Sequence, residues 1–269
     1  VGLGYTGIPR RSPGFMPFDA QDPVMPRPSV PQRGLPLSRR LLLVLLLVAT
    51  QGLALGPLTP APAQDKLRQV DEYTIVGPKS FLDGYTALRG GSNINVVVEI
   101  PAGTNAKWEV RKEDGALVWE FKDGEPRVVQ YLPYPANYGM IPRTLLAKDE
   151  GGDGDPLDVI LLGAAVPRGS VISAWPVGIL RLMDGGEVDD KILAVMPGGP
   201  IEWHKAIALE EVRKNYPGVL EIVEIWFSSY KGPGEMESKG YADAKAAWDM
   251  IHEARETHEE VRGGSADKE

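Results

Sequence analysis

The feature that most restricts the fold of this chain is a series of short apolar runs, each bounded by Gly, Pro or Asp. Runs of this length and spacing are typical of strands in a small closed or half-closed β-barrel. The predicted strands are Ile94–Ile100, Lys107–Lys112, Ala116–Glu120, Leu157–Leu162, Val171–Leu182 and Val188–Met196. We therefore expect a β-dominated α+β fold.

The last third of the chain has helical periodicity. Pro217 is expected in a first helical turn that leads into a helix with a broad apolar face. A second helix is expected from Tyr241 through Arg255, and a disordered tail over residues 263–269. Residues 64–262 are expected to form a single domain, in which Gln64–Leu88 is a wrapping segment and the helices pack outside the strands.

Residues 38–63 have the order of a secretory signal. Ser38-Arg39-Arg40 precedes the apolar run Leu41–Ala49, and Ala61-Pro62-Ala63 resembles a cleavage site. The run is shorter than the roughly 20 residues of a spanning helix, so we expect export to the periplasm or beyond, with no membrane attachment after cleavage. An uncleaved anchor is the alternative. Residues 1–37 are either a disordered leader or a mis-called start, and a cytoplasmic location follows if the whole segment is mis-called.

The mature part is strongly acidic. Residues 1–63 contain six Arg and two Asp, which leaves 23 basic and 35 acidic side chains in residues 64–269. This excess of negative charge disfavours a nucleic-acid partner. The chain has no Cys, and its three His do not form a metal-binding pair, so disulfides and zinc sites of the Cys/His type are not expected.

Three aspartates, Asp153, Asp155 and Asp158, lie within six residues in the sequence Asp-Gly-Asp-Pro-Leu-Asp. Carboxylates this close repel one another unless a cation lies between them, and all-oxygen sites suit Mg²⁺, Mn²⁺ or Ca²⁺. A solvated acidic turn is the alternative. The apolar run Leu157–Leu162 predicts a strand that enters the core, which favours a ligand role for these carboxylates.

Other charged and tyrosine side chains gather in the same half of the chain. Strand alternation places Lys107 with Glu109 on one face, and Asp189 with Lys191 on another; exposed cross-strand ion pairs are the alternative interpretation. Asp184 lies in a turn just before Asp189. The loop Tyr131–Gly139 carries three tyrosine hydroxyls that can donate to phosphate oxygens, or simply lie at the wet edge of packed rings.

In this order, these segments resemble the soluble family I inorganic pyrophosphatases over roughly residues 92–250. Asp153–Asp158 is similar to the family signature D-x-D-P-x-D, and Lys107-Trp108-Glu109 to the element K-[YW]-E. The further similar segments are Val98–Pro101, Tyr134–Gly139 (Y-P-x-N-Y-G), Asp184–Lys191 (D-x₄-D-x-K) and Tyr230-Lys231.

The resemblance implies a five-stranded OB-like closed barrel with peripheral helices, and Mg²⁺-dependent hydrolysis of pyrophosphate to two orthophosphates, with Mn²⁺ as a substitute metal. It implies that Asp155 assists a metal-bridging water that becomes the nucleophile, with Tyr138 close to it. The implied metal ligands are Glu99, Glu109, Asp153, Asp158, Asp184 and Asp189. The implied phosphate-binding residues are Lys107, Arg127, Tyr134, Lys191, Tyr230 and Lys231. The resemblance also implies a homo-oligomer, commonly a hexamer.

Two departures from the family pattern affect the phosphate-binding residues. Arg127 lies in a stretch whose length differs from the usual spacing, and Gly232–Met236 replaces a Lys-rich segment, so that one contact is absent or comes from Lys239. The implied set contains seven carboxylates and four cations. We expect divalent metal to bind before substrate, because the bare site repels a polyanion.

The sequence disfavours two rival functions and leaves a third open. A calcium-binding EF-hand counted from Asp153 needs Gly and Glu where the chain has Asp158 and Ala164, and Pro156 interrupts a calcium-binding glycine repeat. An oligonucleotide-binding module needs a basic groove, which the acidic cluster opposes. A non-catalytic OB-type module that binds metal or phosphate stays as the alternative function.

Overall fold

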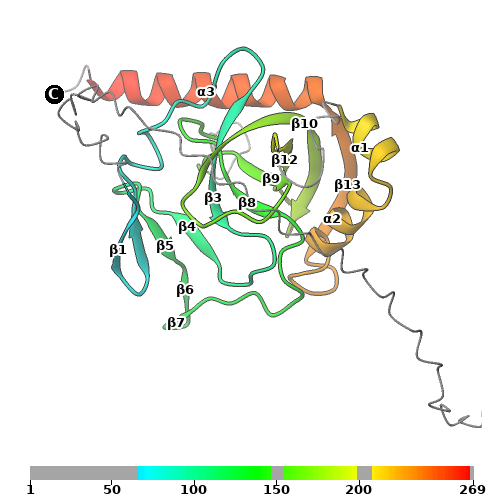
Figure 1. Ribbon diagram of the computed structural model, residues 1–269, viewed down its shortest axis with the longest axis horizontal. Coiled ribbons are helices and arrows are strands. Elements are labelled where there is room, and N and C mark those ends of the chain that lie inside the picture. Colours follow the sequence, from blue (N-terminus) through cyan, green and yellow to red (C-terminus); the bar gives the residue numbers. More distant parts are fainter. Residues whose placement is uncertain (1–65, 147–153, 199–207, 267–269) are drawn as a thin grey trace, which may run out of the picture. The chain divides into compact units, whose positions relative to one another are not determined.

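The strands at the heart of the described part pair in a ring. The computed structural model describes residues 66–146, 154–198 and 208–266, which belong to one compact unit, Thr59–Glu269. Each of the ring strands pairs with the next and the last pairs with the first, as Figure 1 shows; only the β9–β12 pairing is parallel. In ring order the strands are β3 (Ile94–Ile100), β8 (Asn137–Met140), β9 (Asp158–Leu162), β12 (Lys191–Val195) and β10 (Val171–Asp184).

Both faces of the ring strands are covered. All seven residues of β3 and all five of β12 are buried. Neighbouring residues alternate between two apolar clusters: Ile160 packs in one, whereas Val159 and Leu161 pack in the other, as the two-residue period of a strand requires. Strands buried on both faces read as continuous Val/Ile/Leu runs, which explains the apolar runs of the sequence.

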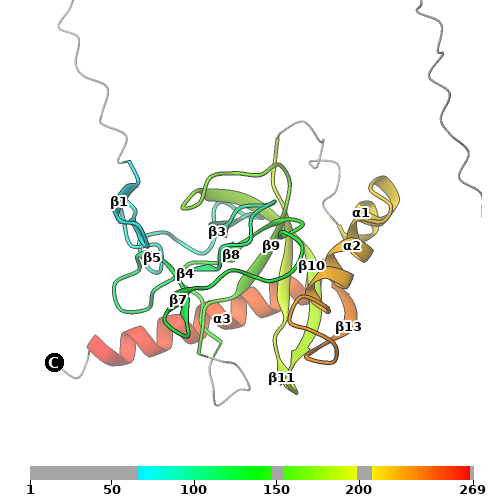
Figure 2. The same ribbon diagram turned by 90° about the horizontal axis from the view of Figure 1, so that it is seen from below.

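Helices cover the two clusters. α1 (Leu209–Asn215) and α2 (Val219–Phe227) add Leu209, Val223 and Trp226 to the first cluster, and α3 (Ala244–Ala266) adds Ala247 and Ile251 to the second. In Figures 1 and 2, β13 (Met236–Asp243) runs beside β10, with which it pairs, and leads into α3.

A second sheet packs beside β3. Its order is β1 (Arg68–Asp71), β2 (Thr74–Val76), β5 (Leu117–Trp119) and β4 (Trp108–Val110). Trp108 stacks on Trp119 with ring centroids 5.7 Å apart, and Trp108 shares a third apolar cluster with Val97 of β3. Two short hairpins project from this framework: β6 (Phe121–Lys122) with β7 (Glu125–Pro126), and β11 (Glu187–Val188) with the end of β10.

The β-dominated α+β fold with helices outside the strands is confirmed. The predicted strand Ile94–Ile100 matches β3, and the predicted apolar helix matches α2. Val188–Met196 is not one strand, because the Asp190 carboxylate accepts a hydrogen bond from the Leu182 amide at 3.0 Å and interrupts the ladder before β12. The segment Gln64–Leu88 contains β1 and β2.

Two expectations near the C-terminus were wrong. Tyr241 lies in β13, paired with Leu180, and the helix starts after Asp243, whose Oδ1 accepts the Ala246 N–H at 2.9 Å. Pro217 precedes α2, whose N-cap Gly218 has a φ of +86°, a conformation that glycine adopts without strain. α3 has the bounds Ala244–Ala266, and the tail over residues 263–269 stays a prediction.

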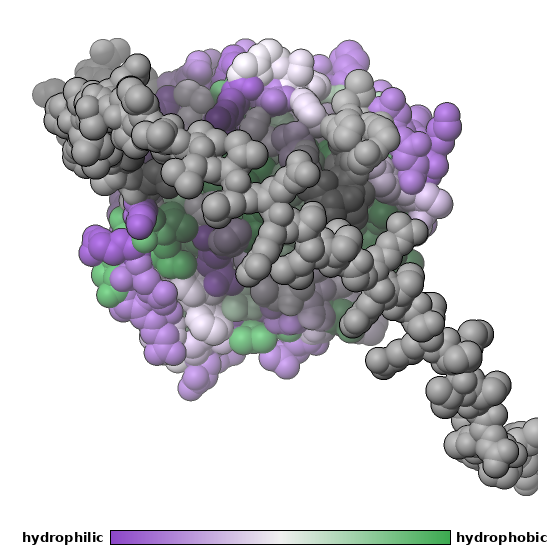
Figure 3. Space-filling model, in the orientation of Figure 1, coloured by the Kyte–Doolittle hydropathy of each residue, from purple (hydrophilic) through white to green (hydrophobic). Residues whose placement is uncertain are grey.

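The predicted signal segment and leader, residues 1–63, lie outside the described residues. No helix in the described ranges is long and apolar enough to cross a membrane. On the face seen in Figure 3, hydrophilic residues dominate the coloured periphery, and hydrophobic residues gather in smaller patches between them.

Candidate active site

Glu99 is the buried carboxylate of β3. Its side chain is 5% exposed, and its Oε1 accepts a hydrogen bond from the Val110 N–H at 2.7 Å. Burial raises the pKa of Glu99 to about 8, and the nearby Lys107 ammonium offsets only part of this effect. A bound cation would favour the ionised form of such a buried carboxyl group, so Glu99 suits the role of a cation ligand.

Lys191 joins two further predicted ligands. Its Nζ lies 2.5 Å from Asp158 Oδ2 and 2.6 Å from Asp189 Oδ1. Asp158 and Lys191 begin the parallel strands β9 and β12, which explains why residues 33 positions apart meet. Burial opposes the charge on Asp158, but Lys191 outweighs it and lowers the pKa of that carboxyl group. Burial raises the pKa of Asp189.

Tyrosine rings line the space beside these charges. Lys107 Nζ and Lys191 Nζ lie 5.8 and 6.0 Å from the centre of the Tyr138 ring, and the Tyr138 hydroxyl is one of the groups that lower the pKa of Asp158. The Tyr134 ring lies 5.5 Å from that of Tyr138, and the Tyr230 ring stacks on Trp226. Burial raises the pKa of all three tyrosines, so they act as neutral hydrogen-bond donors at neutral pH.

The signature loop enters the site from beyond Leu146. The Gly154 N–H donates to the Leu146 carbonyl at 2.8 Å, and the Leu146 N–H donates to the Asp155 carbonyl at 2.9 Å. Gly154 has a φ of +81°, which favours glycine at this position of the signature. The Asp155 carboxylate forms an ion pair with Lys112. Asp153, the first predicted ligand of the signature, lies outside the described residues.

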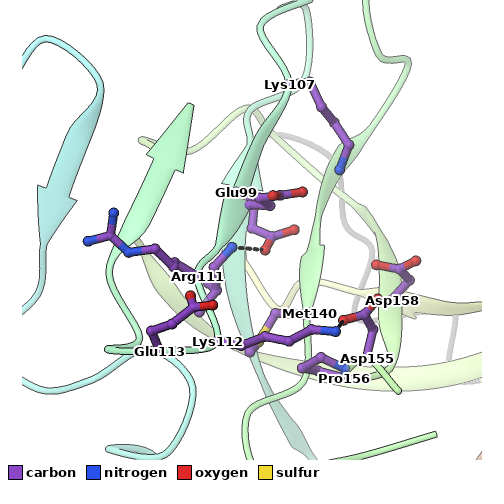
Figure 4. A pocket seen from close by; sticks show the side chains of 11 residues that line it. Glu99, Lys107, Arg111, Lys112, Glu113, Met140, Asp155, Pro156 and Asp158 are labelled. Atoms are coloured by element: carbon purple, nitrogen blue, oxygen red, sulfur yellow. Dashed lines mark hydrogen bonds and ion pairs between the residues drawn. The ribbon is translucent and has the colours of Figure 1, made fainter. Parts of the chain in front are cut away.

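An acidic pocket of about 380 Å³ collects several of these groups (Figure 4). Five carboxylates line it against three cations, an excess of two negative charges. Figure 4 shows the carboxylates of Glu99 and Asp158 and the ammonium of Lys107 directed into one space, with the Lys112–Asp155 pair at its edge. Its charged lining residues are Glu99, Lys107, Glu109, Arg111, Lys112, Glu113, Asp155 and Asp158.

A basic pocket of about 470 Å³ has the opposite charge balance. Lys122, Arg127 and Lys231 line it, together with Tyr230 and one carboxylate, Glu235. Two of these cations are held in place by carboxylates: Arg127 Nη1 lies 2.7 Å from Glu120 Oε1, and Lys231 forms an ion pair with Asp184.

Backbone hydrogen bonds place the two pockets side by side. The Lys107 N–H donates to the Arg127 carbonyl, the Glu120 N–H donates to the Lys107 carbonyl, and the Arg127 N–H donates to the Glu120 carbonyl, over 2.7 to 3.0 Å. The irregular spacing before Arg127 is explained by the β6–β7 hairpin, which occupies residues 121–126 and returns the chain so that Glu120 and Arg127 lie together.

The structure thus brings the described predicted residues into two neighbouring pockets and the ion pairs around them. Glu109, half-buried, lines the acidic pocket, and burial raises its pKa. Asp184 forms an ion pair with Lys231, whereas Asp158 forms one with Lys191. Among the described residues, no three acidic, histidine or cysteine side chains form a ready-made metal site. Lys239 pairs with Glu237 on β13 and lines neither pocket.

Three residues of the site were missed by sequence reasoning. Lys112 holds Asp155, Lys122 lines the basic pocket, and Arg168 donates to the Glu99 carbonyl at 2.8 Å with its guanidinium 4.4 Å from the Trp108 ring centre. The first two lie in or beside turns, and a turn's direction is not readable from strand alternation. Arg168 lies in the turn Pro167-Arg168-Gly169 before β10, to which the sequence analysis assigned no role.

Together the fold and site define a β-dominated α+β protein with adjacent acidic and basic pockets, as expected of a metal-dependent enzyme that acts on an anion. The family model for inorganic pyrophosphatase matches residues 96–259. The inorganic pyrophosphatase of Kluyveromyces lactis is 34% identical over 194 residues, which cover 64% of this chain and 67% of that protein.

Solved structures agree with this match. Type I inorganic pyrophosphatase from Toxoplasma gondii has a TM-score of 0.67 and 25% identity, over 73% of this chain and 98% of that one. A truncated vacuolar soluble pyrophosphatase of Trypanosoma cruzi, solved in complex with PPi, has a TM-score of 0.64 and 26% identity, over 70% and 81%. The chain described here belongs to the inorganic pyrophosphatase family, and the resemblance found in its motifs is confirmed.

Proposed function

We propose that this protein hydrolyses inorganic pyrophosphate to two orthophosphates in a Mg²⁺-dependent reaction. The observation that carries the proposal is the difference in charge between two neighbouring pockets: five carboxylates line one of them against three cations, whereas Arg127 and Lys231 line the other beside one carboxylate, Glu235. A divalent cation fits the first pocket, and a compact polyanion fits the junction of the two.

The donor set suits a hard cation. Glu99, Asp155 and Asp158 offer carboxylate oxygens within one pocket, and burial raises the pKa of Glu99 despite the nearby Lys107 ammonium. We assign metal binding to Glu99, Glu109, Asp153, Asp158, Asp184 and Asp189. Bound Mg²⁺ neutralises these carboxylates and the phosphoryl oxygens, and lowers the pKa of water; Mn²⁺ has the same ligand preference.

Asp155 accepts the proton of the attacking water in this proposal. Its carboxylate lies at the edge of the acidic pocket, where the ion pair with Lys112 fixes its position. The Tyr138 hydroxyl favours the ionised form of the Asp158 carboxylate. The water oxygen bonds to one phosphorus while the bridging P–O bond breaks, and the second phosphate leaves with the bridging oxygen.

The cations and tyrosines of the junction hold the two phosphoryl groups. Lys107 and Lys191 flank the Tyr138 ring at the acidic side, and Arg127, Tyr230 and Lys231 line the basic pocket, with Tyr134 beside Tyr138. These groups are fixed before substrate arrives, so they can stabilise the charge that grows on the leaving phosphate without reorganising.

Finer features of the assembly are also proposed. The ring of pairings, with one parallel pair, supports a five-stranded OB-like closed barrel. Family membership supports a homo-oligomer, with a hexamer as the expected form.

The order of residues 38–63 supports export. N-terminal sequencing of the natively expressed protein tests this proposal: a start near Gln64 is expected, and retention of residues 38–63 would contradict export with cleavage.

Phosphate release from pyrophosphate tests the function. We expect turnover with Mg²⁺ and none in excess chelator, and Asp155→Asn should reduce kcat by about 10²–10⁴ while the circular dichroism spectrum stays unchanged. Asp243→Asn, an exposed helix cap away from both pockets, is the matched control and should keep the wild-type rate. Pyrophosphate binding with no phosphate release would favour the non-catalytic module instead.

A further inference from the structure

Lys122 is a cation of the basic pocket that no role in the proposed reaction uses. It ends β6, in the short hairpin that separates Glu120 from Arg127. The turn of this hairpin is Asp123-Gly124, and both residues have positive φ, at 55° and 82°. Such a turn fixes the register of a two-residue hairpin, so that Lys122 has a defined place beside the pocket.

The charge of Lys122 is available to a ligand. Arg127 is paired with Glu120, and Lys231 with Asp184, whereas Lys122 forms no ion pair with any residue in the described ranges. Glu235 is the one carboxylate that lines the same pocket. An anion that enters here therefore meets a positive charge which the protein itself has not compensated.

The space beside Lys122 continues beyond the junction of the two pockets. A groove of about 620 Å³ shares Gln130, Tyr230 and Lys231 with the basic pocket and extends over Ser228 and Ser229. The two phosphoryl groups of pyrophosphate are assigned to Lys107, Lys191, Arg127 and Lys231. Lys122 and Gln130 also line the basic pocket, and neither is assigned to a phosphoryl group of pyrophosphate.

We propose that Lys122 and Gln130 form an outer phosphate subsite, which binds the third phosphoryl group of a linear tripolyphosphate. This inference rests on the proposed function, because it takes the inner phosphoryl positions from it. Lys122 determines specificity between chain lengths: it contacts the longer anion and not pyrophosphate. Gln130, whose Nε2 donates to the Val128 carbonyl at 3.2 Å, offers a fixed amide at the same wall.

Binding titrations of the Mg²⁺-loaded Asp155→Asn protein test the subsite without depending on turnover. We expect Lys122→Ala to weaken tripolyphosphate binding by about tenfold, the effect of one lost charge-assisted hydrogen bond, and to change pyrophosphate binding by less than about twofold. Lys122→Arg should keep most of the tripolyphosphate affinity. Lys214→Ala, which removes an equal charge from the exposed end of α1, should change neither affinity.

Equal losses for the two anions, or no loss for tripolyphosphate, would overturn the outer subsite. This outcome differs from failure of the proposed function, in which wild-type protein releases no phosphate from pyrophosphate. If the protein hydrolyses pyrophosphate but binds tripolyphosphate equally well with and without Lys122, the proposed function holds and the outer subsite is wrong.

Discussion

Lys191 is the residue that makes the acidic part of the site compatible with folding. Its side chain is 6% exposed and lies between Asp158 and Asp189. Burial alone would lower the pKa of an ammonium group, but the two carboxylates raise the pKa of Lys191 instead. Lys191 therefore stabilises the fold by neutralising Asp158 and Asp189, in addition to its proposed contact with a phosphoryl group.

Removing this charge should cost stability. Lys191→Met leaves two carboxylates without their shared counter-ion, and we expect the free energy of unfolding to fall by about 3–5 kcal/mol in chelator. Urea unfolding measures it. Lys245→Met is the matched control, because its pair with Asp249 is exposed and exposed ion pairs add little to stability. Equal losses in the two variants would contradict the role assigned to Lys191.

Glu99 predicts a specific pH dependence for the metal-free protein. The pKa of Glu99 is about 8 in the folded state and near 4.5 as a free side chain, so the folded state binds the extra proton between these values. The contribution of Glu99 to stability is therefore fully present below about pH 4.5 and declines as pH rises towards 8, by at most about 1.4 kcal/mol per pH unit.

The Glu99→Gln variant isolates this contribution. Unfolding in chelator at pH 5, 6.5 and 8 should show a shallower decline for Glu99→Gln than for wild type, because the amide cannot titrate. Saturating Mg²⁺ should also flatten the wild-type profile, since a bound cation favours the ionised carboxylate. A decline of equal slope in the variant would show that other groups cause it.

At the scale of elements, the β3–β8 contact explains two residues of the Y-P-x-N-Y-G motif that carry no chemistry. A Cβ on Gly139 would lie 1.8 Å from the Val97 carbonyl oxygen, so β8 can pack against β3 only with glycine there. Asn137 is fully buried, and its Oδ1 accepts the Ala102 and Val166 N–H groups at 3.2 and 3.1 Å. The motif is thus partly structural, and its tyrosines depend on that structure.

Gly139→Ala should therefore separate β8 from β3. We expect a loss of about 3 kcal/mol or more in the free energy of unfolding, at the high end for overpacked sites, because the obstacle is backbone. Gly91→Ala is the control, since an added Cβ there meets nothing within 4 Å and its φ is not positive. Thermal unfolding compares them, and a Gly139→Ala protein as stable as the control would contradict the close approach.

One strand with both faces buried was predicted at its correct position, but another was missed: the sequence placed Asn137–Gly139 in a loop, whereas these residues belong to β8, which is also buried throughout. The continuous run Ile94–Ile100 has no other favourable place than a covered strand, and β3 has those bounds. Tyr241 misled the prediction because its helical spacing continues into α3, whereas pairing with Leu180 holds it in β13. Tertiary pairing overrides local periodicity in such short segments.

At the scale of the whole molecule, the candidate site depends on contacts between distant segments. The motifs identified the carboxylates and cations, but not that Lys112 would reach the signature loop or that the β6–β7 hairpin would bring Lys122 beside Arg127. Those placements follow from the directions of turns, which one sequence does not encode in a readable pattern. The division into an acidic and a basic pocket appears once these turns are in place.

The central claim is that divalent metal converts a site that repels pyrophosphate into one that binds it. Calorimetric titration of pyrophosphate into the Asp155→Asn protein, once in excess chelator and once with saturating Mg²⁺, tests this most directly. We expect no measurable pyrophosphate binding in chelator and tight pyrophosphate binding with Mg²⁺. Pyrophosphate affinity that is equally high in chelator would contradict it.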